Sequence, residues 1–307
     1  MITGVLRVWW RLLAVAAVWA FAGGCADERS PVLPEVVKAP AKIARCVLTL
    51  QDARAGDVAR ERLQRDIDQY VSGRPGRVAY SFLELNSGVG FGHAEHQHDM
   101  ITASGAKVDI LTALMLDRDR LHEDERDLAE RMIIESDNGA ADALWGRVGG
   151  AMSGVYQRLG LNETAPGPGM YWGGTSTSPA DRIRLLKVLV NGGKGLSDGD
   201  RALVLGLMGR VVKDQSWGVS AAARPGDRVA LKNGWTPRPF IHNTWAVTSY
   251  GRVVGPGRDL LLAVQTDQQP GEGPGIETIE RVARMIGSRF DELSPTTTRS
   301  CPKNPVA

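Results

Sequence analysis

The sequence predicts an α+β fold, in which helices flank an antiparallel β-sheet and a helical subdomain is inserted between the strands. Three observations predict it. Two strand-like patterns occupy residues 78–93, helical patterns fill residues 104–222, and three further strands precede a final helix in residues 228–290. A sheet built from both ends of the chain brings those ends together and lets the first and last helices cover one sheet face. We assign the folded domain to residues 46–301, with the helical subdomain at about 104–222.

The first 24 residues predict an export signal. Two arginines precede an apolar run from Leu12 to Phe21, and the small residues Ala22-Gly23-Gly24 stand directly before Cys25. This arrangement resembles a bacterial lipobox, so we expect a lipoprotein signal peptide at 1–24 and lipidation of Cys25. The protein would then be extracytoplasmic and anchored by lipid to the cell membrane. Two alternatives stay open: ordinary cleavage beside an incidental cysteine, or retention as an anchor, for which the apolar stretch is short.

Residues 25–45 predict a tether, because prolines stand there among charged and small residues. Two cysteines remain beyond the lipidated position, Cys46 and Cys301, at the two ends of the folded domain. An exported compartment permits disulfides, so we predict a bond between them, with two free thiols as the alternative. Residues 302–307 form a tail.

The charge balance argues against a nucleic-acid partner. The formal net charge is +2, and the two arginines of the export signal account for it, leaving 35 basic and 35 acidic residues. The sequence gives no sign of a metal or cofactor site, so we expect neither. We expect a monomer that has the membrane as a partner through its lipid anchor.

The opening of the domain predicts one helix and two strands. Apolar residues recur at roughly helical spacing from Val47 to Val71. The β-branched and aromatic run from Val78 to Leu85 predicts a strand, and Asn86-Ser87-Gly88 turns the chain toward a partner strand at 89–93.

The middle and the end of the domain follow the same logic of periodicity and turn signals. One predicted helix begins near Ser104. The others span Asp124–Ile134, Ala140–Val148, Ala180–Val190 and Ser197–Val212. A loop rich in Pro, Gly and Thr separates two of them at 162–178. The closing elements are strands at Arg228–Leu231, Asn243–Tyr250 and Leu260–Thr266 and a helix at Ile276–Phe290.

Ser104 and Lys107 are the candidate nucleophile and general base. Residues i and i+3 share a helix face, so a lysine one turn after a serine can take the serine proton. Withdrawal from water lowers a lysine pKa by up to several units, a larger effect than that of the helix dipole. The pattern S-x-x-K also occurs at Ser300–Lys303, so alone it favours a helix-terminal serine and a solvated lysine.

Two further strings follow in order along the chain. Ser136-Asp137-Asn138 supplies a second hydroxyl and an amide, or alternatively caps the helix that starts at Gly139 or Ala140. Both interpretations hold together if Asp137 caps while its neighbours face the site. Lys232-Asn233-Gly234 supplies a second amine at the end of a strand, or alternatively forms a surface Asn-Gly turn.

The three strings resemble the S-x-x-K, S-D-N and K-T-G signatures of serine β-lactamases and penicillin-binding proteins. The resemblance covers about residues 78–290. Residues 132–141 are similar to the helix–loop–helix around the second signature, and residues 217–219 and 229–235 are similar to exported actinobacterial members with a class A-like domain. The resemblance implies the β-lactamase/transpeptidase-like fold and acyl transfer through a serine.

The resemblance also implies a role for each residue of the strings. Ser104 would be the acylated nucleophile and Lys107 its general base, while Ser136 would relay a proton to the leaving amine. Asn138 would bind a substrate amide. Lys232 would place positive charge near the relay and the substrate carboxylate.

The third string departs from the family's pattern. Asn233 stands where Thr or Ser is usual, and Trp235 replaces a small hydroxyl residue, so its ring would narrow the cleft or stack on a substrate. Gly234 would let a bound carbonyl approach the strand, and the backbone N–H groups of Ser104 and Trp235 would form the oxyanion hole. Matching the family's loop places Arg158 at the position of the glutamate that serves deacylation in class A enzymes.

The nearest acid to that position is Glu163, which we interpret as a solvated loop or cap residue. We therefore expect an exported serine hydrolase that acts by acyl transfer on an amide or ester, such as a β-lactam or a D-alanyl peptide, with slow deacylation. The alternative is a catalytically decayed domain that serves as a binding or scaffolding module at the cell envelope. The departures at Asn233 and Trp235 and the absent glutamate favour that alternative. For the enzyme, the resemblance implies a small-molecule or peptidoglycan-derived substrate.

Overall fold

The centre of the molecule is a five-stranded antiparallel sheet with the strand order β3-β2-β8-β7-β6. The computed structural model describes residues 47–49, 53–117, 121–293 and 298–300. The strands are β2 (Arg77–Glu84), β3 (Gly90–His93), β6 (Arg228–Arg238), β7 (Thr244–Gly255) and β8 (Arg258–Gln269). Because β2 pairs with β8, the sheet joins strands from the two ends of the domain, and the predicted α+β architecture is confirmed.

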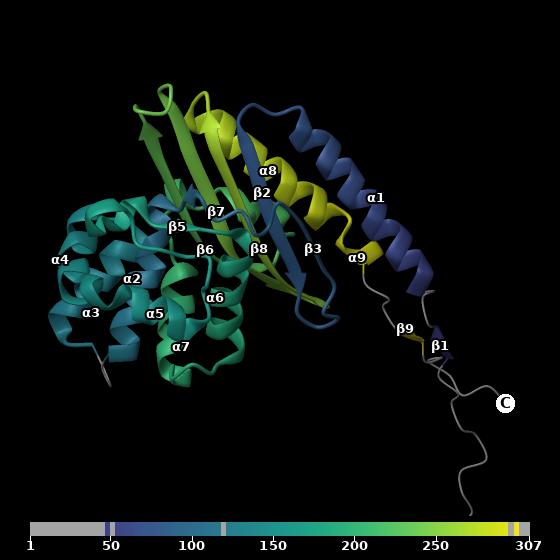
Figure 1. Cartoon of the computed structure of the whole chain (residues 1–307). Helices are drawn as coiled ribbons and strands as arrows, with labels where there is room; N and C mark the ends of the chain where they lie inside the picture. Colours follow the sequence, from purple (N-terminus) through teal and green to yellow (C-terminus); the bar gives the residue numbers. More distant parts are fainter. Residues whose placement is uncertain (1–46, 50–52, 118–120, 294–297, 301–307) are drawn as a thin grey trace, which may run out of the picture. The chain divides into compact units, whose positions relative to one another are not determined.

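Two helices cover one face of this sheet, α1 (Ala53–Ser72) and α8 (Glu272–Ser288), followed by the short α9 (Phe290–Leu293) (Figure 1). Leu63 and Ile67 of α1 and Ile279 of α8 are fully buried against alternate residues of the strands, such as Val264 of β8. This is the predicted arrangement of the first and last helices. It follows from the apolar stripe of each helix, which needs an apolar partner face.

The helical middle lies on the other face of the sheet. Its helices are α2 (Ala106–Asp117), α3 (Glu123–Ile134), α4 (Asn138–Val148), α5 (Met152–Leu159), α6 (Pro179–Asn191) and α7 (Asp198–Met208). The residues of α2 from Ala106 to Met115 are all buried, so this helix is surrounded by others rather than lying at the surface. The short helix α5 was missing from the sequence prediction.

Several predicted boundaries are wrong. The first helix does not begin at Val47, because Val47–Thr49 form β1, which pairs with β9 (Thr298–Ser300). A further small sheet joins β4 (Met100–Ile101) to β5 (Ser176–Thr177). The largest correction concerns Lys232-Asn233-Gly234, which lies in the middle of β6 rather than at a strand end or a turn. Cys46 and Cys301 lie outside the described residues, and their disulfide stays a prediction.

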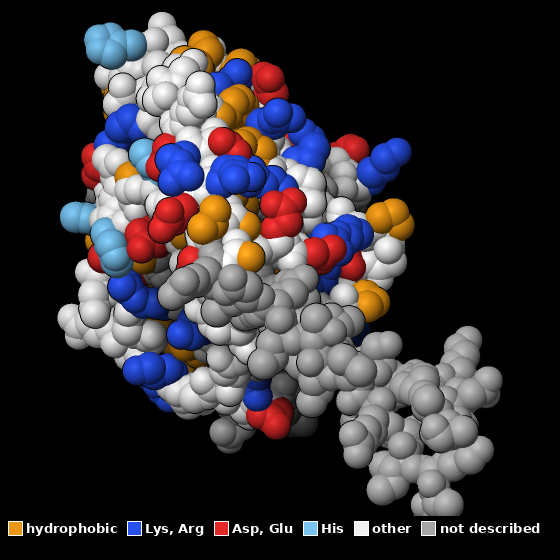
Figure 2. Space-filling view, turned by 90° about the vertical axis from the view of Figure 1, so that its right-hand side faces the viewer, with side chains coloured by type: hydrophobic (Ala, Val, Ile, Leu, Met, Phe, Trp, Pro, Cys, Tyr) orange, Lys and Arg blue, Asp and Glu red, His pale blue; other side chains and the backbone are white. Residues whose placement is uncertain are grey.

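The face that carries α1 mixes charges of both signs, as Figure 2 shows. Ion pairs form there between helices. Arg289, at the C-terminal end of α8, pairs with Asp66 of α1 at 2.5 Å. Such exposed pairs keep a surface solvated and contribute little to stability. Within the described part of the chain, every helix is too short or too polar to cross a membrane. The export signal, the tether and Cys25 lie outside the described residues.

Candidate active site

Ser104 lies in a 3₁₀ turn, η1 (Ala103–Gly105), that leads directly into α2. Its side chain is partly exposed, whereas Lys107, one turn later, is fully buried. The turn is tight, since Ala103 takes a left-handed conformation with φ of 45°. The predicted placement of Ser104 at a helix start is therefore confirmed, and the lysine is withdrawn from water as expected.

The Lys107 amine meets the second string. Its Nζ donates to the Ser136 carbonyl oxygen at 2.6 Å, to Ser136 Oγ at 3.0 Å and to Asn138 Oδ1 at 2.7 Å. Ser136 adopts φ of 61°, while Asp137 caps α4 by accepting a hydrogen bond from the Ala140 N–H at 2.5 Å. Both interpretations of this string thus hold at once: Asp137 caps the helix, and its two neighbours bind the lysine.

The third string reaches the same hydroxyl. Lys232 is fully buried in β6, and its Nζ donates to Ser136 Oγ at 3.0 Å and to the Asn233 carbonyl oxygen at 2.9 Å. The Ser136 hydroxyl therefore lies between two lysine amines that are 125 residues apart in the sequence. Residues from all three strings meet at one place, as the sequence predicts.

Burial changes the acid–base behaviour of both amines. Loss of water lowers the pKa of Lys107 to about 8, although the charges of Asp137 and Asp142 act in the opposite direction. Burial, reinforced by the positive charge of Lys107, holds the pKa of Lys232 well below its ordinary value. An amine with such a pKa can accept a proton near neutral pH, which an ordinary surface lysine does not do.

Strand β6 passes directly behind the turn that carries Ser104. A Cβ added to Gly234 would lie 2.3 Å from the Thr102 carbonyl oxygen and 2.7 Å from the Ser104 nitrogen, so only glycine permits this approach. From the next strand, the Tyr250 hydroxyl donates to the Gly105 carbonyl oxygen at 2.8 Å. These contacts fix the backbone on both sides of Ser104.

The side chains of Asn233 and Trp235 alternate with those of Lys232 and Gly234 along β6, and so point to the other face of the sheet. Asn233 is fully buried, and its Nδ2 donates to the carbonyl oxygens of Gln215 and Trp217 at 2.8 and 3.0 Å. The ring of Trp235 packs against the core beneath α8, edge to face with Trp217 at 5.8 Å. The ring therefore points away from Lys232. A substrate contact through the backbone N–H of Trp235 stays a prediction.

Sequence reasoning missed Trp172 and Asp142. Trp172 begins the turn η4 (Trp172–Gly174) in the loop between α5 and α6, and its ring lies 5.0 Å from Lys107 Nζ. The indole N–H donates to Asp142 Oδ1 of α4 at 2.7 Å. The loop is irregular, so periodicity offers no sign of which of its residues turns inward.

A second buried charge lies two residues beyond Lys107 on α2. Asp109 Oδ1 accepts a hydrogen bond from Arg182 Nη1 of α6 at 2.6 Å, and both side chains are buried. Arg182 also lies over the ring of Tyr250, 5.5 Å from its centroid. This pair supports the site from behind, through the tyrosine that holds Gly105.

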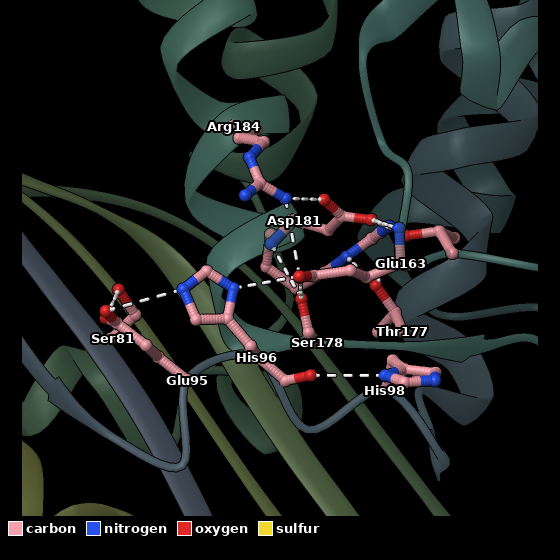
Figure 3. Close-up of polar contacts among 11 residues, drawn as sticks. Ser81, Glu95, His96, His98, Glu163, Thr177, Ser178, Asp181 and Arg184 are labelled. Atoms are coloured by element: carbon pink, nitrogen blue, oxygen red, sulfur yellow. Dashed lines mark hydrogen bonds and ion pairs between the residues drawn. The ribbon is translucent and has the colours of Figure 1, made fainter.

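Glu163 and Arg158 do not join the site. Glu163 belongs to a separate polar cluster (Figure 3), where it pairs with His96 at 2.8 Å and Arg184 at 3.4 Å and accepts a hydrogen bond from Ser178. Burial opposes its ionisation, but the bonds from Ser178 and His96 outweigh this and lower the pKa of Glu163. Glu163 is thus an anchor of the loop rather than a solvated residue. Arg158 is exposed, and its Nε donates to the Lys194 carbonyl oxygen at 2.9 Å.

Among the described residues, no group of three or more His, Cys, Asp or Glu side chains is arranged to hold a metal ion. The polar groups that converge at Ser136 are two amines, a hydroxyl and an amide. Amines that donate hydrogen bonds are not metal ligands. An amine and a hydroxyl in contact can instead transfer protons to and from a substrate carbonyl group.

Comparison with known proteins gives a consistent result. The model of a family described as "Beta-lactamase enzyme family" matches residues 117–290, a range that begins after Ser104 and Lys107. A protein named "Putative lipoprotein LppW" from Mycobacterium tuberculosis is 29% identical over 199 residues, which is 60% of this chain and 62% of that protein. The match therefore leaves more than a third of that relative's length uncovered.

Solved structures share the fold. One described as "Structure of PBP-A" is 26% identical, with a TM-score of 0.64 over 76% of this chain and 97% of that chain. A β-lactamase from Xanthomonas campestris pv. campestris is 18% identical, with a TM-score of 0.62 over 76% of this chain and 98% of that chain, and supports the fold alone.

Proposed function

The chain belongs to the β-lactamase enzyme family, and on this premise we propose that it is a serine hydrolase that acts by acyl transfer on an amide or ester. One observation carries the proposal: the Ser136 hydroxyl accepts hydrogen bonds from two buried lysines. Lys107 lies one turn after Ser104, and Lys232 lies in the middle of β6. Neighbouring amines whose pKa values are lowered are typical of sites that transfer protons.

In the first step the Ser104 hydroxyl oxygen attacks the substrate carbonyl carbon. The neutral Lys107 amine takes the hydroxyl proton, and the carbonyl becomes a tetrahedral oxyanion. The backbone N–H groups of Ser104 and Trp235 stabilise that oxyanion, and the close approach at Gly234 brings the two backbones together. Neutral Lys107 becomes abundant as the pH rises through about 8.

In the second half of acylation the leaving group needs a proton. Ser136 Oγ delivers its own proton to the leaving amine or alkoxide and takes one back from Lys107, at 3.0 Å. Lys232, at the same distance on the other side, stabilises the negative charge that develops on the Ser136 oxygen. Breaking the bond to the leaving group leaves the acyl group on Ser104.

Hydrolysis of that acyl-enzyme is expected to be slow. Arg158, which the sequence match would place at the deacylating glutamate, is exposed near the end of α5, while Glu163 is held by His96, Ser178 and Arg184. Neither is in contact with Ser104 or Lys107. A mutant of PBP-A has been solved as an acyl-enzyme complex with penicillin G, which supports a β-lactam as the first substrate class to test here. The D-alanyl peptide remains part of the proposal from the sequence resemblance.

A non-catalytic binding role is the second candidate. It is favoured by the engagement of all three Lys107 protons with Ser136 and Asn138, while the Ser104 hydroxyl forms no hydrogen bond among the described residues. A site at rest in the ammonium form would bind a carbonyl ligand without cleaving it.

Location at the membrane is part of the proposal. The lipobox-like sequence before Cys25 and the lipoprotein name of the mycobacterial relative support a lipid anchor outside the cytoplasm. Metabolic labelling with a fatty acid should be lost in Cys25→Ser. In the unreduced mature protein, mass spectrometry should find Cys46 bonded to Cys301, and two free thiols would exclude the disulfide.

Covalent labelling tests the enzyme directly. Purified protein is treated with a fluorescent penicillin and with a fluorophosphonate, and the modified peptide is identified by mass spectrometry. We expect labelling at Ser104, loss of labelling in Ser104→Ala, and full labelling in the matched control Ser300→Ala, which alters the other S-x-x-K string. Failure of both probes to label, or labelling that survives Ser104→Ala, supports the binding role instead.

A further inference from the structure

Trp172 is a buried aromatic residue beside the Lys107 amine. Only 5% of its surface is exposed, although it belongs to an irregular loop, and its neighbours Met170 and Tyr171 are exposed. Lys107 Nζ lies over the ring, 5.0 Å from the centroid. This geometry is that of a cation–π contact in a site shielded from water.

The ring is held in place from two sides. Its N–H donates to Asp142 Oδ1 at 2.7 Å, and the loop is fixed near it by Trp145, whose indole N–H donates to the Met170 carbonyl oxygen at 2.8 Å. Farther along, Ala165 and Ser176 form an antiparallel bridge that closes the base of the loop. Trp172 is thus presented by a braced segment rather than by a free loop.

The charged groups that face Lys107 come from three neighbouring segments. Lys232 approaches from β6, Asp142 from α4, and Asp137 from the cap of α4. The polar atoms of Ser136 and Asn138 take up the three protons of the ammonium. The buried Trp172 ring, 5.0 Å from the same amine, helps to keep it from solvent.

We propose that Trp172 is a positioning residue for Lys107, with Asp142 fixing the plane of the ring so that its face both excludes water from the amine and stabilises the ammonium. The inference rests on the proposed role of Lys107 as general base. It adds that Trp172 adjusts the proton affinity of the Lys107 amine.

Two opposing effects of the ring make the inference testable. Exclusion of water disfavours the charged amine, by up to ~3–5 pKa units for full burial. The π face favours the charged amine and, in a desolvated contact, raises its titration midpoint by about one and a half pH units. A leucine at this position would keep the first effect and remove the second.

The experiment compares Trp172→Leu with Trp172→Phe. Both variants lose the N–H donor to Asp142 and both stay apolar, so they differ in whether an aromatic face covers the amine. The titration of Lys107 is followed by NMR with ¹³C-labelled lysine, assigned by Lys107→Met. We expect the Lys107 midpoint in the leucine variant to fall about one pH unit below that in the phenylalanine variant.

Asp142→Asn and Trp145→Leu complete the set. Asp142→Asn keeps an acceptor for the indole N–H but removes a charge that favours the ammonium, so the midpoint should fall. Trp145→Leu removes one brace of the loop but keeps the Trp172 ring and its bond to Asp142, so the Lys107 midpoint should shift less than in Trp172→Leu. Equal midpoints in Trp172→Leu and Trp172→Phe, or an equal shift in Trp145→Leu, would overturn the inference.

The pH dependence of labelling at Ser104 gives the functional readout. Its rising limb should move with the Lys107 midpoint in each variant. Because the NMR titration needs no activity, absence of labelling at Ser104 would count against the proposed function alone. Unshifted Lys107 midpoints beside normal labelling would count against the role of Trp172 alone.

Discussion

Helix α2 carries two buried ionisable residues, Lys107 and Asp109, which differ in whether a counter-ion contacts them. Asp109 meets Arg182 at 2.6 Å, and this pair is satisfied by the fold itself. Lys107 forms no ion pair within the described residues. Its amine meets neutral acceptors, an aromatic ring and, across the Ser136 hydroxyl, a second lysine, while Asp137 and Asp142 favour its charged form without an ion pair. A compensated buried charge serves the structure, whereas an uncompensated one is kept at a cost in stability and marks the site of chemistry.

The largest expected effect is on activity, from Lys107→Met. Loss of the general base should slow covalent labelling of Ser104 by about 10²–10⁴-fold. Stability should stay level or rise, since an apolar side chain of similar volume suits a buried position better than an amine. Stopped-time labelling and urea unfolding measure the two quantities. A marked loss of stability would show that Lys107 is a structural residue like Asp109.

Asp109→Asn should have the reverse profile. It leaves Arg182 buried without its counter-ion, at an expected cost of about 3–5 kcal/mol in the free energy of unfolding. The matched control is Glu61→Gln, which breaks the exposed pair with Arg65 and should change stability by less than about 0.5 kcal/mol. Equal effects of the two variants in urea unfolding would remove the distinction between the buried pair and a surface pair.

The pH dependence of stability sharpens the comparison further. The pKa of Lys107 is about 8 in the folded protein and near its ordinary 10.5 when unfolded. Between these values the unfolded chain binds a proton that the folded chain has released, so the free energy of unfolding should rise with pH by ~1.4 kcal/mol per unit. Lys232 acts in the same direction. In Lys107→Met the rise between pH 8 and 10 should be smaller, and an unchanged slope would contradict the assigned pKa.

The smallest effect is expected from Glu163→Gln. The side chain is partly exposed and shared among three partners, so its loss should cost less than about 1 kcal/mol. Neither the rate of labelling at Ser104 nor the lifetime of the acyl-enzyme should change. A longer-lived acyl-enzyme in this variant would identify Glu163 as a deacylating base after all.

The sequence predicted the sheet and its covering helices from local periodicity, and the meeting of the three strings from their resemblance to the family's ordered signatures. It failed for Lys232-Asn233-Gly234, where an Asn-Gly pair typical of turns lies inside a long strand. There the pairing with β7 and the bonds from Asn233 to Gln215 and Trp217 override the local preference.

The partners of the two buried charges could not be read from the sequence. Asp109 and Arg182 are 73 residues apart, and Trp172 meets Lys107 from a loop without periodic pattern. Such contacts are fixed by tertiary packing, and a single sequence gives no sign of which charged residue will be buried with which partner. The sequence identified the lysine that the chemistry needs but not the residues that adjust its proton affinity.

The two amines on either side of the Ser136 hydroxyl have a consequence for the thermodynamics of inhibitors. Burial lowers the affinity of both amines for hydrogen ions, and the charge of Lys107 lowers that of Lys232 further, so the pair releases hydrogen ions at a lower pH than two surface lysines would. An anionic ligand such as a boronate adduct would restore that affinity and draw a hydrogen ion from the buffer as it docks. Its calorimetric heat of association should therefore vary with the ionisation enthalpy of the buffer, and its affinity should weaken as the medium becomes alkaline.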